Sequence, residues 1–183
     1  MKYLSMVMAL GAEKWDGSLP EFNIPYEREC ASDDVRRAVE SEHVLAVAPG
    51  AAYGAAKRWD TAHFREVCRW WLDEKQGTVV VLSAKNEAES ASVAVEGLSG
   101  DRVVDLAGKT TLFELMKILQ NAELCVANDS GNMHLSAALG GRGVAPFGPT
   151  DPAATSPISA KWRLLFNKQE CAPCFKRVCP NGS

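Results

Sequence analysis

The sequence predicts an α/β fold in which a parallel sheet is covered by helices on both faces. The main observation is that short apolar runs alternate with segments of helical periodicity, as in consecutive strand–helix units. The expected strands are residues 44–48, 78–82, 102–106, 123–127, 142–147 and 162–166. The composition agrees, because 46% hydrophobic and 23% charged residues are usual for a globular domain. A chain of 183 residues can bury one core and is short for two full domains.

Helices are expected both before the first strand and between the strands. Residues 1–10 have the pattern of a short amphipathic helix, and Ser32 begins a polar helix over residues 32–41 with two acidic residues in its first turn. Between the strands, two segments carry apolar residues at the spacing of a helix face that packs against a core. These stripes are Phe64, Val67, Cys68, Trp71 and Leu72, and then Leu112, Leu115, Met116 and Leu119.

The most informative polar cluster is Asn-Asp-Ser-Gly-Asn-Met-His at residues 128–134, between an apolar run and an alanine-rich helical run. This position is the carboxyl end of a strand and the first turn of a helix, where open α/β sheets bind ligands and free helix amides favour phosphate. The alternative is that Asp129 or Ser130 only caps the helix. A cap needs neither Gly131, which permits close approach to the backbone, nor His134 about one turn further. The cluster therefore predicts a phosphate or nucleotide binder.

Two further loops are expected at the same edge of the sheet. Residues 48–59 contain two glycines followed by Lys57 and Arg58, two cations that can neutralise a diphosphate. The alternative for this pair is a solvated surface position. Residues 147–152 form a turn after a strand, either as the opposite wall of the site or only as a turn. The sequence has neither the phosphate-loop motif that ends in Gly-Lys-Ser/Thr nor a Gly-x-Gly-x-x-Gly fingerprint.

Charge and termini exclude several classes of protein. With 20 basic and 23 acidic side chains the formal charge is −3, so we expect no nucleic-acid partner. The apolar start of the chain ends at Glu13 and Lys14, which is too short for a bilayer span. It also lacks the longer core and the cleavage site of a signal peptide. We expect a cytoplasmic protein.

The six cysteines are expected to be reduced thiols. Cys30, Cys68 and Cys125 are isolated, and the last two lie on apolar faces, where a buried free thiol is usual. The segment from Cys171 to Cys179 has the spacing C-x₂-C-x₄-C, which resembles a zinc knuckle but has no fourth ligand nearby. We therefore expect no metal site, with a structural metal as the alternative.

Five motifs, taken together and in order, resemble one family. They are Pro49-Gly50-Ala51 with Lys57-Arg58-Trp59, Asp105-Leu106-Ala107-Gly108-Lys109-Thr110, the cluster at 128–134, Phe147-Gly148-Pro149-Thr150, and the cysteine segment from Cys171 to Pro180. From about residue 43 to the end, the chain resembles the carboxy-terminal half of glycosyltransferase family nine, the ADP-heptose:lipopolysaccharide heptosyltransferases. Within that family it is most similar to the heptosyltransferase II branch.

The resemblance implies a GT-B architecture, in which two Rossmann-like domains face each other and the carboxy-terminal one binds the nucleotide-sugar donor. Residues 43–183 are then the donor domain, and residues 1–42 are the connector from an amino-terminal acceptor domain that has no counterpart here. The implied reaction transfers heptose from ADP-heptose to the inner core of lipopolysaccharide, without a cofactor. The family takes its base from the absent domain, so the catalytic residue is unassigned and the chain alone is expected to be inactive. The full enzyme is expected to be peripheral at the inner membrane.

Site residues follow from the resemblance by position. Lys57 resembles the lysine that contacts the donor phosphates. The residues that resemble the signature for diphosphate and sugar are Asp129, Ser130, Gly131 and His134. Asn86 or Glu87 falls near the family's acidic residue for the nucleoside. We take Glu87, since a carboxylate can accept ribose hydroxyl protons, with a helix first-turn acid as the alternative.

The chain also departs from the family pattern. Asp60 replaces the proline usual after Lys-Arg-Trp and is expected to change the loop. Pro146 replaces an apolar strand residue and is expected to shorten the strand. The chain ends at Ser183, short of the family's terminal segment, as expected of a gene fragment, an excised domain or a split enzyme. The alternative functions are a non-catalytic nucleotide-binding or interaction module, or another GT-B sugar-nucleotide enzyme such as an epimerase.

Overall fold

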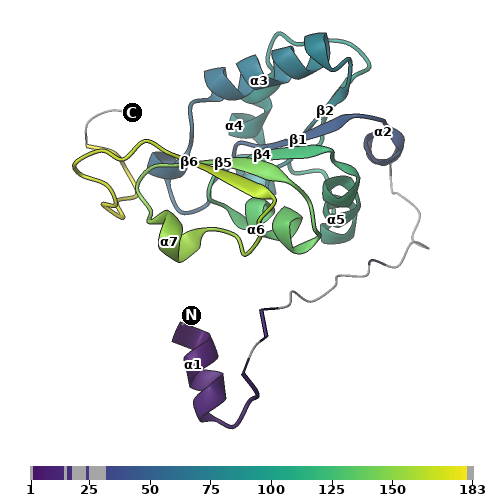
Figure 1. Ribbon diagram of the computed structural model, residues 1–183. Coiled ribbons are helices and arrows are strands. Elements are labelled where there is room, and N and C mark those ends of the chain that lie inside the picture. The colour runs from purple at the N-terminus through teal and green to yellow at the C-terminus, as the bar shows by residue number, and fades with distance from the viewer. Residues whose placement is uncertain (1, 15, 18–23, 25–31, 181–183) are drawn as a thin grey trace.

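The computed structural model describes residues 2–14, 16, 17, 24 and 32–180, and its centre is one six-stranded parallel sheet (Figure 1). The strands are β1 (Val44–Ala48), β2 (Thr78–Val81), β3 (Val103–Asp105), β4 (Leu124–Ala127), β5 (Gly143–Phe147) and β6 (Trp162–Phe166). Each lies within one residue of its expected bounds. The spatial order β3-β2-β1-β4-β5-β6 places the switch in strand order between β1 and β4, where this topology binds ligands.

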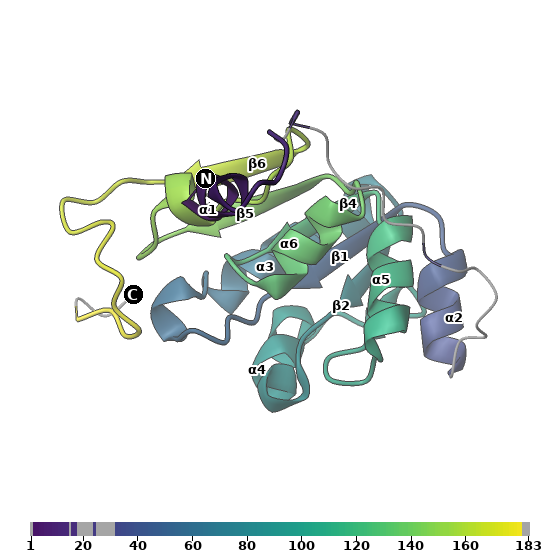
Figure 2. The same cartoon turned by 90° about the horizontal axis from the view of Figure 1, so that it is seen from below.

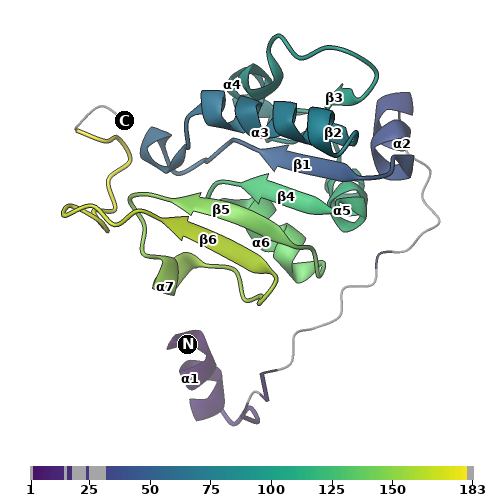
Figure 3. The same cartoon turned by 45° about the horizontal axis from the view of Figure 1, so that its top comes forward.

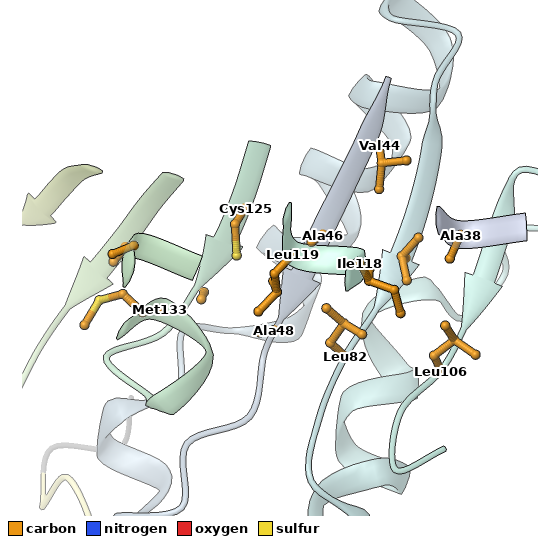
Figure 4. Packing of buried hydrophobic residues seen from close by; sticks show 14 of the residues in the cluster. Ala38, Val44, Ala46, Ala48, Leu82, Leu106, Ile118, Leu119, Cys125 and Met133 are labelled. Carbon is orange, nitrogen blue, oxygen red and sulfur yellow. The ribbon is translucent and has the colours of Figure 1, made fainter. Parts of the chain in front are cut away.

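Helices cover both faces of the sheet, as predicted. The helices α3 (Thr61–Glu74) and α4 (Ala88–Ser92) lie on one face, and α2 (Asp33–Glu40), α5 (Leu112–Asn121) and α6 (Gly131–Ala138) lie on the other. Figure 2 shows α5 and α6 across the second face. Side chains alternate accordingly, and Leu45 and Val47 of β1 pack with α3. On the other face, Ala46 and Ala48 pack with α5 and α6, as Figure 4 shows.

The two predicted helix stripes differ in outcome. In α3 the expected core residues are confirmed, since Phe64, Cys68 and Trp71 are all at most 2% exposed. In α5 the prediction for Leu112 is wrong, because its side chain is 66% exposed. Leu112 is the first residue of the helix, directly after the Thr111 cap, and the core contacts come from the last turns instead. Ile118, which was not in the predicted stripe, is fully buried there.

Among the described residues, two helices precede the sheet in the chain. The predicted amino-terminal helix is α1 (Lys2–Ala9), and the predicted polar helix is α2, whose cap Ser32 accepts a hydrogen bond from the Val35 amide. Although α2 belongs to the segment expected to be a connector, its residues Val35 and Ala38 are in the core below the sheet. No helix among the described residues is long and apolar enough to cross a membrane.

The structure resolves the effect of both departures from the family pattern. Asp60 caps α3, with its carboxylate accepting a 2.8 Å hydrogen bond from the Ala62 amide, so it fixes where the loop ends. The expectation that Pro146 shortens its strand is wrong, because β5 runs on to Phe147 and pairs with β6 along its whole length. Successive amides of a strand point toward opposite neighbouring strands, and the Gly143 amide donates toward β6. The nitrogen at position 146 therefore faces the β4 side, where the pairing of β5 with β4 has already ended at Val144. Proline therefore removes no ladder hydrogen bond.

Short elements that the sequence did not predict connect the strands at the edge where the site lies. They are η1 (Ala55–Lys57), η2 (Lys85–Glu87), η3 (Val93–Val95) and α7 (Pro152–Thr155). Figure 3 shows that the arrows of β1, β4, β5 and β6 all end on the side of the carboxy-terminal segment. The loops after these strands are therefore brought together at one edge of the sheet.

Candidate functional site

An open pocket of about 440 Å³ lies at the carboxyl edge of the sheet, between the loops that follow β1, β4 and β5. Its lining consists of Ala52, Tyr53, Lys57, Asp129, Ser130, Gly131, His134, Ala154 and Thr155. Five of the six predicted site residues are in this lining, so the structure brings them together although Lys57 is far from the others in sequence. The sixth, Glu87, lies outside the lining.

Asp129 is the centre of a buried hydrogen-bond network. Its Oδ2 atom accepts hydrogen bonds from Lys57 Nζ at 2.7 Å, Thr150 Oγ1 at 2.7 Å and Thr155 Oγ1 at 3.2 Å. The side chains of Asp129 and Lys57 are only 6% and 12% exposed, and a buried charge needs such partners to offset its desolvation. Asp129 therefore holds Lys57 and α7 against the β4–α6 turn. Thr155 was missed because it lies on a four-residue helix that the sequence pattern does not reveal.

The amino terminus of α6 is open. Ser130 occupies the cap position with extended backbone (φ −149°, ψ 172°), but its side chain makes no capping hydrogen bond. Its Oγ atom is buried and has no hydrogen-bond partner among the described residues. The interpretation of Asp129 or Ser130 as a cap alone is therefore wrong. The first-turn amides keep their hydrogen-bonding capacity, and with the helix dipole they form a site suited to an anion.

Gly131 and His134 line the pocket from the first turn of α6. A Cβ atom built on Gly131 has nothing within 4 Å, and this glycine does not have a positive φ. Neither packing nor backbone conformation requires glycine here, so the open space in front of the amides is its distinctive effect. The His134 side chain is exposed at the same mouth, and its amide donates to the Ser130 carbonyl at 3.4 Å.

Glu87 supports the Lys57 loop from below. Its side chain is 9% exposed, and Oε1 accepts hydrogen bonds from the Ala51 amide at 2.9 Å and from Arg58 Nη2 at 3.0 Å. The loop passes so close that a Cβ atom on Gly50 would lie 2.7 Å from Glu87 Oε2. The alternative of a helix first-turn acid also describes its place, because Glu87 lies in the first turn of η2, although its side chain makes no capping hydrogen bond to α4. A contact between Glu87 and a nucleoside stays a prediction.

The cysteine segment packs against the same loop. Tyr53 Oη donates to the Phe175 carbonyl at 2.9 Å, and the Ala56 amide donates to the Arg177 carbonyl at 3.0 Å. The Tyr53 ring has Lys57 Nζ 5.0 Å and the Arg177 guanidinium 5.2 Å from its centroid, both within cation–π range. This segment thus helps to shape the wall of the pocket.

The cysteines differ in environment. Burial raises the pKa of the Cys68 and Cys125 thiols from 9.0 to about 12, while Cys171 is exposed. In residues 32–180 and the other described positions, no three His, Cys, Asp or Glu side chains are grouped so that they could hold a metal ion. Cys30 lies outside the described residues.

Comparison with known proteins identifies the family of the chain. The sequence model of glycosyltransferase family 9 (heptosyltransferase) matches residues 4–183. Lipooligosaccharide heptosyltransferase 2 of Campylobacter jejuni is 34% identical over 142 residues, which are 75% of this chain and 44% of that protein. Lipopolysaccharide heptosyltransferase 2 of Escherichia coli is 34% identical over 125 residues, which are 67% of this chain and 36% of that protein.

A solved structure has the same fold. The structure of E. coli ADP-heptose LPS heptosyltransferase II superposes with a TM-score of 0.65 and 28% sequence identity, over 80% of this chain and 47% of that chain. The predicted fold class, one half of a GT-B glycosyltransferase, is thereby confirmed. The chain spans only 36% to 47% of the length of these three relatives. The family model and the two relatives establish that the chain belongs to glycosyltransferase family 9, the heptosyltransferase family.

Proposed function

We propose that this chain is the donor-binding half of a heptosyltransferase and that it binds ADP-heptose with the diphosphate against the amino terminus of α6. The observation that carries the proposal is the uncapped first turn of α6, which faces a pocket that also contains Lys57. Backbone amides and a lysine are the groups that commonly bind phosphate oxygens in proteins. The name of the solved E. coli relative includes ADP-heptose, which supports the choice of nucleotide sugar.

In the proposed reaction, a hydroxyl group of the lipopolysaccharide inner core attacks the anomeric carbon of the heptose and ADP departs. Negative charge then develops on the diphosphate, where the α6 amides and Lys57 stabilise it without reorganising. His134, at the exposed mouth of the pocket, is placed to contact the sugar or its adjoining phosphate. The acceptor, cytoplasmic action and peripheral association with the inner membrane belong to the whole enzyme in this proposal.

The base that deprotonates the acceptor is proposed to come from another domain. A general base must face the proton it removes at about 2.6–3.2 Å. Both candidate carboxylates of this chain are buried and engaged, Asp129 by Lys57 and two threonines and Glu87 by the Ala51 amide and Arg58. Closure of two domains around the substrates also fixes the reacting groups and excludes water. We therefore also propose that residues 1–183 alone do not transfer heptose.

The test combines binding and transfer. Titration calorimetry should show that ADP binds more tightly than adenosine, and that His134→Ala weakens ADP binding while the melting temperature is unchanged. The control is His43→Asn. His43 is exposed in the turn before β1, at the opposite edge of the sheet, and asparagine tolerates the positive φ of 48° at this position. An affinity for ADP equal to that for adenosine would refute the diphosphate site.

The transfer assay uses ADP-heptose and a lipopolysaccharide core acceptor. The purified chain should give only background release of ADP, and addition of the amino-terminal domain of a relative should raise it. Saturable transfer by the chain alone would show that a base lies within this domain.

A further inference from the structure

Asn128 directly precedes Asp129 and is fully buried, yet it lies outside the lining of the pocket. Its side-chain amide makes two hydrogen bonds to one loop. The Nδ2 atom donates to the Pro49 carbonyl at 2.7 Å, and the Oδ1 atom accepts from the Trp59 amide at 3.0 Å. Pro49 and Trp59 are the two ends of the loop that carries Lys57. One planar group therefore holds together both ends of this loop.

The far end of the loop is anchored to the core as well as to Asn128. The Trp59 ring packs edge-on against Phe64 of α3 with ring centroids 5.2 Å apart, and Phe64 is fully buried. At the near end, the Asn128 amide also donates to the Ala48 carbonyl at 3.3 Å, which continues the pairing of β4 with β1. The loop is thus fixed at both ends against the segment that contains Asp129, the partner of Lys57.

Asparagine is the residue type that this position requires. Its side chain offers a donor and an acceptor on one rigid amide, and here the donor meets a carbonyl and the acceptor meets an amide. An ionised aspartate would accept from Trp59 but would direct negative charge at the Pro49 carbonyl. Alanine would leave both backbone groups without these partners in a buried place.

We infer that Asn128 is a positioning residue for donor binding: by holding both ends of the loop from Pro49 to Trp59, it keeps Lys57 beside Asp129 at the diphosphate pocket. This inference rests on the proposed function for its ligand. Asn128 does not touch the pocket itself, so it acts through the loop and through Lys57 in particular.

The first measurement needs no ligand. Hydrogen exchange followed by mass spectrometry should show faster exchange in peptides from residues 49–59 of Asn128→Ala than of wild type. The matched control is Asn121→Ala, which also removes a side-chain amide that donates to two carbonyls, those of Ala38 and Ser41, away from the site. Asn121→Ala should leave exchange in the loop unchanged. Unchanged loop exchange in Asn128→Ala would overturn the inference.

The second measurement separates positioning from general stability. Asn128→Ala should weaken ADP binding by roughly ten-fold or more, the effect of a lost hydrogen bond to a charged group, with a smaller effect on adenosine. In a Lys57→Met background the same change should weaken ADP by less than about three-fold, because coupled residues are not additive. Additive losses, or equal losses for ADP and adenosine, would overturn the inference.

A pH series gives a further readout through Asn128→Asp. A protonated carboxyl again offers one donor and one acceptor, and full burial at this position would raise the pKa of the introduced carboxyl above its usual value of about 3.9. The ADP affinity of this variant should therefore approach that of wild type as the pH falls from 8 to 5. A ratio of affinities that does not change with pH would contradict the hydrogen-bonding role. If wild type shows no preference for ADP over adenosine, the proposed function fails, while loop exchange in Asn128→Ala still decides whether Asn128 holds the loop.

Discussion

Gly131→Ala should stabilise the protein and impair nucleotide binding, because the two effects have different origins. Alanine is preferred over glycine in helix interiors by about 0.5–1 kcal/mol, and because Gly131 is the first residue of α6 this value is the upper bound of the gain. The new Cβ atom has nothing within 4 Å, so no clash offsets that gain. For a chain of this size the gain corresponds to a melting temperature higher by at most roughly 4 °C. If packing or backbone conformation required a glycine at this position, its replacement by alanine would lower the melting temperature instead.

The same Cβ atom lies where the diphosphate must approach the first amides of α6. Loss of one hydrogen bond to a charged group costs about 1.5–3 kcal/mol, which predicts roughly 10- to 100-fold weaker ADP binding. Calorimetric titration and thermal unfolding measure the two effects on the same sample. The control is Ala138→Gly at the exposed last turn of α6, which should lower the melting temperature and leave ADP affinity unchanged. An ADP affinity of Gly131→Ala equal to that of wild type would refute the reasoning.

Two further predictions concern stability. Lys57→Met should lower the free energy of unfolding by about 3–5 kcal/mol, because it leaves the Asp129 carboxylate buried without its cation. In urea titrations, the double variant Lys57→Met with Asp129→Asn should recover most of that loss, and equal stability of the single and double variants would contradict this. Burial raises the pKa of the Cys68 and Cys125 thiols from 9.0 to about 12, so the folded state favours the protonated thiols. The free energy of unfolding that this provides is present below pH 9 and should be lost as the pH rises toward 12, by about 1 kcal/mol per thiol between pH 9 and 10. Urea midpoints at pH 8, 9 and 10 should therefore fall less steeply in Cys68→Ala with Cys125→Ala than in wild type, and parallel slopes would exclude the thiols as the cause.

The central strands β1 and β2 were predictable because they are buried on both faces, so that a run such as Val79–Val81 is apolar without interruption. The pocket was predictable for a related reason, since residues 128–134 follow such a strand directly. The place of Glu87 was not predictable, because its carboxylate binds the amide of Ala51, 36 positions earlier in the chain. For Thr155 the same reason adds to the shortness of its helix: its hydroxyl contacts Asp129, 26 positions earlier in the chain, and no local pattern predicts such a contact.

The charge of the pocket also differs from what the sequence suggests. Lys57 and Arg58 appear in the sequence as two cations available to a diphosphate, but in the structure each faces an acid, Asp129 at 2.7 Å and Glu87 at 3.0 Å. The two pairs together add no net charge beneath the loop. Attraction for an anion must therefore come largely from groups whose charge is not cancelled, and the open amides of α6 carry a partial positive charge of about half a unit. In this arrangement Lys57 contributes to phosphate binding through directed hydrogen bonds rather than through net charge, since its ammonium group retains two donors after it binds Asp129. This explains why the site needs a loop that is held firmly in place: a donor whose charge is already paired helps a phosphate only if it points at it.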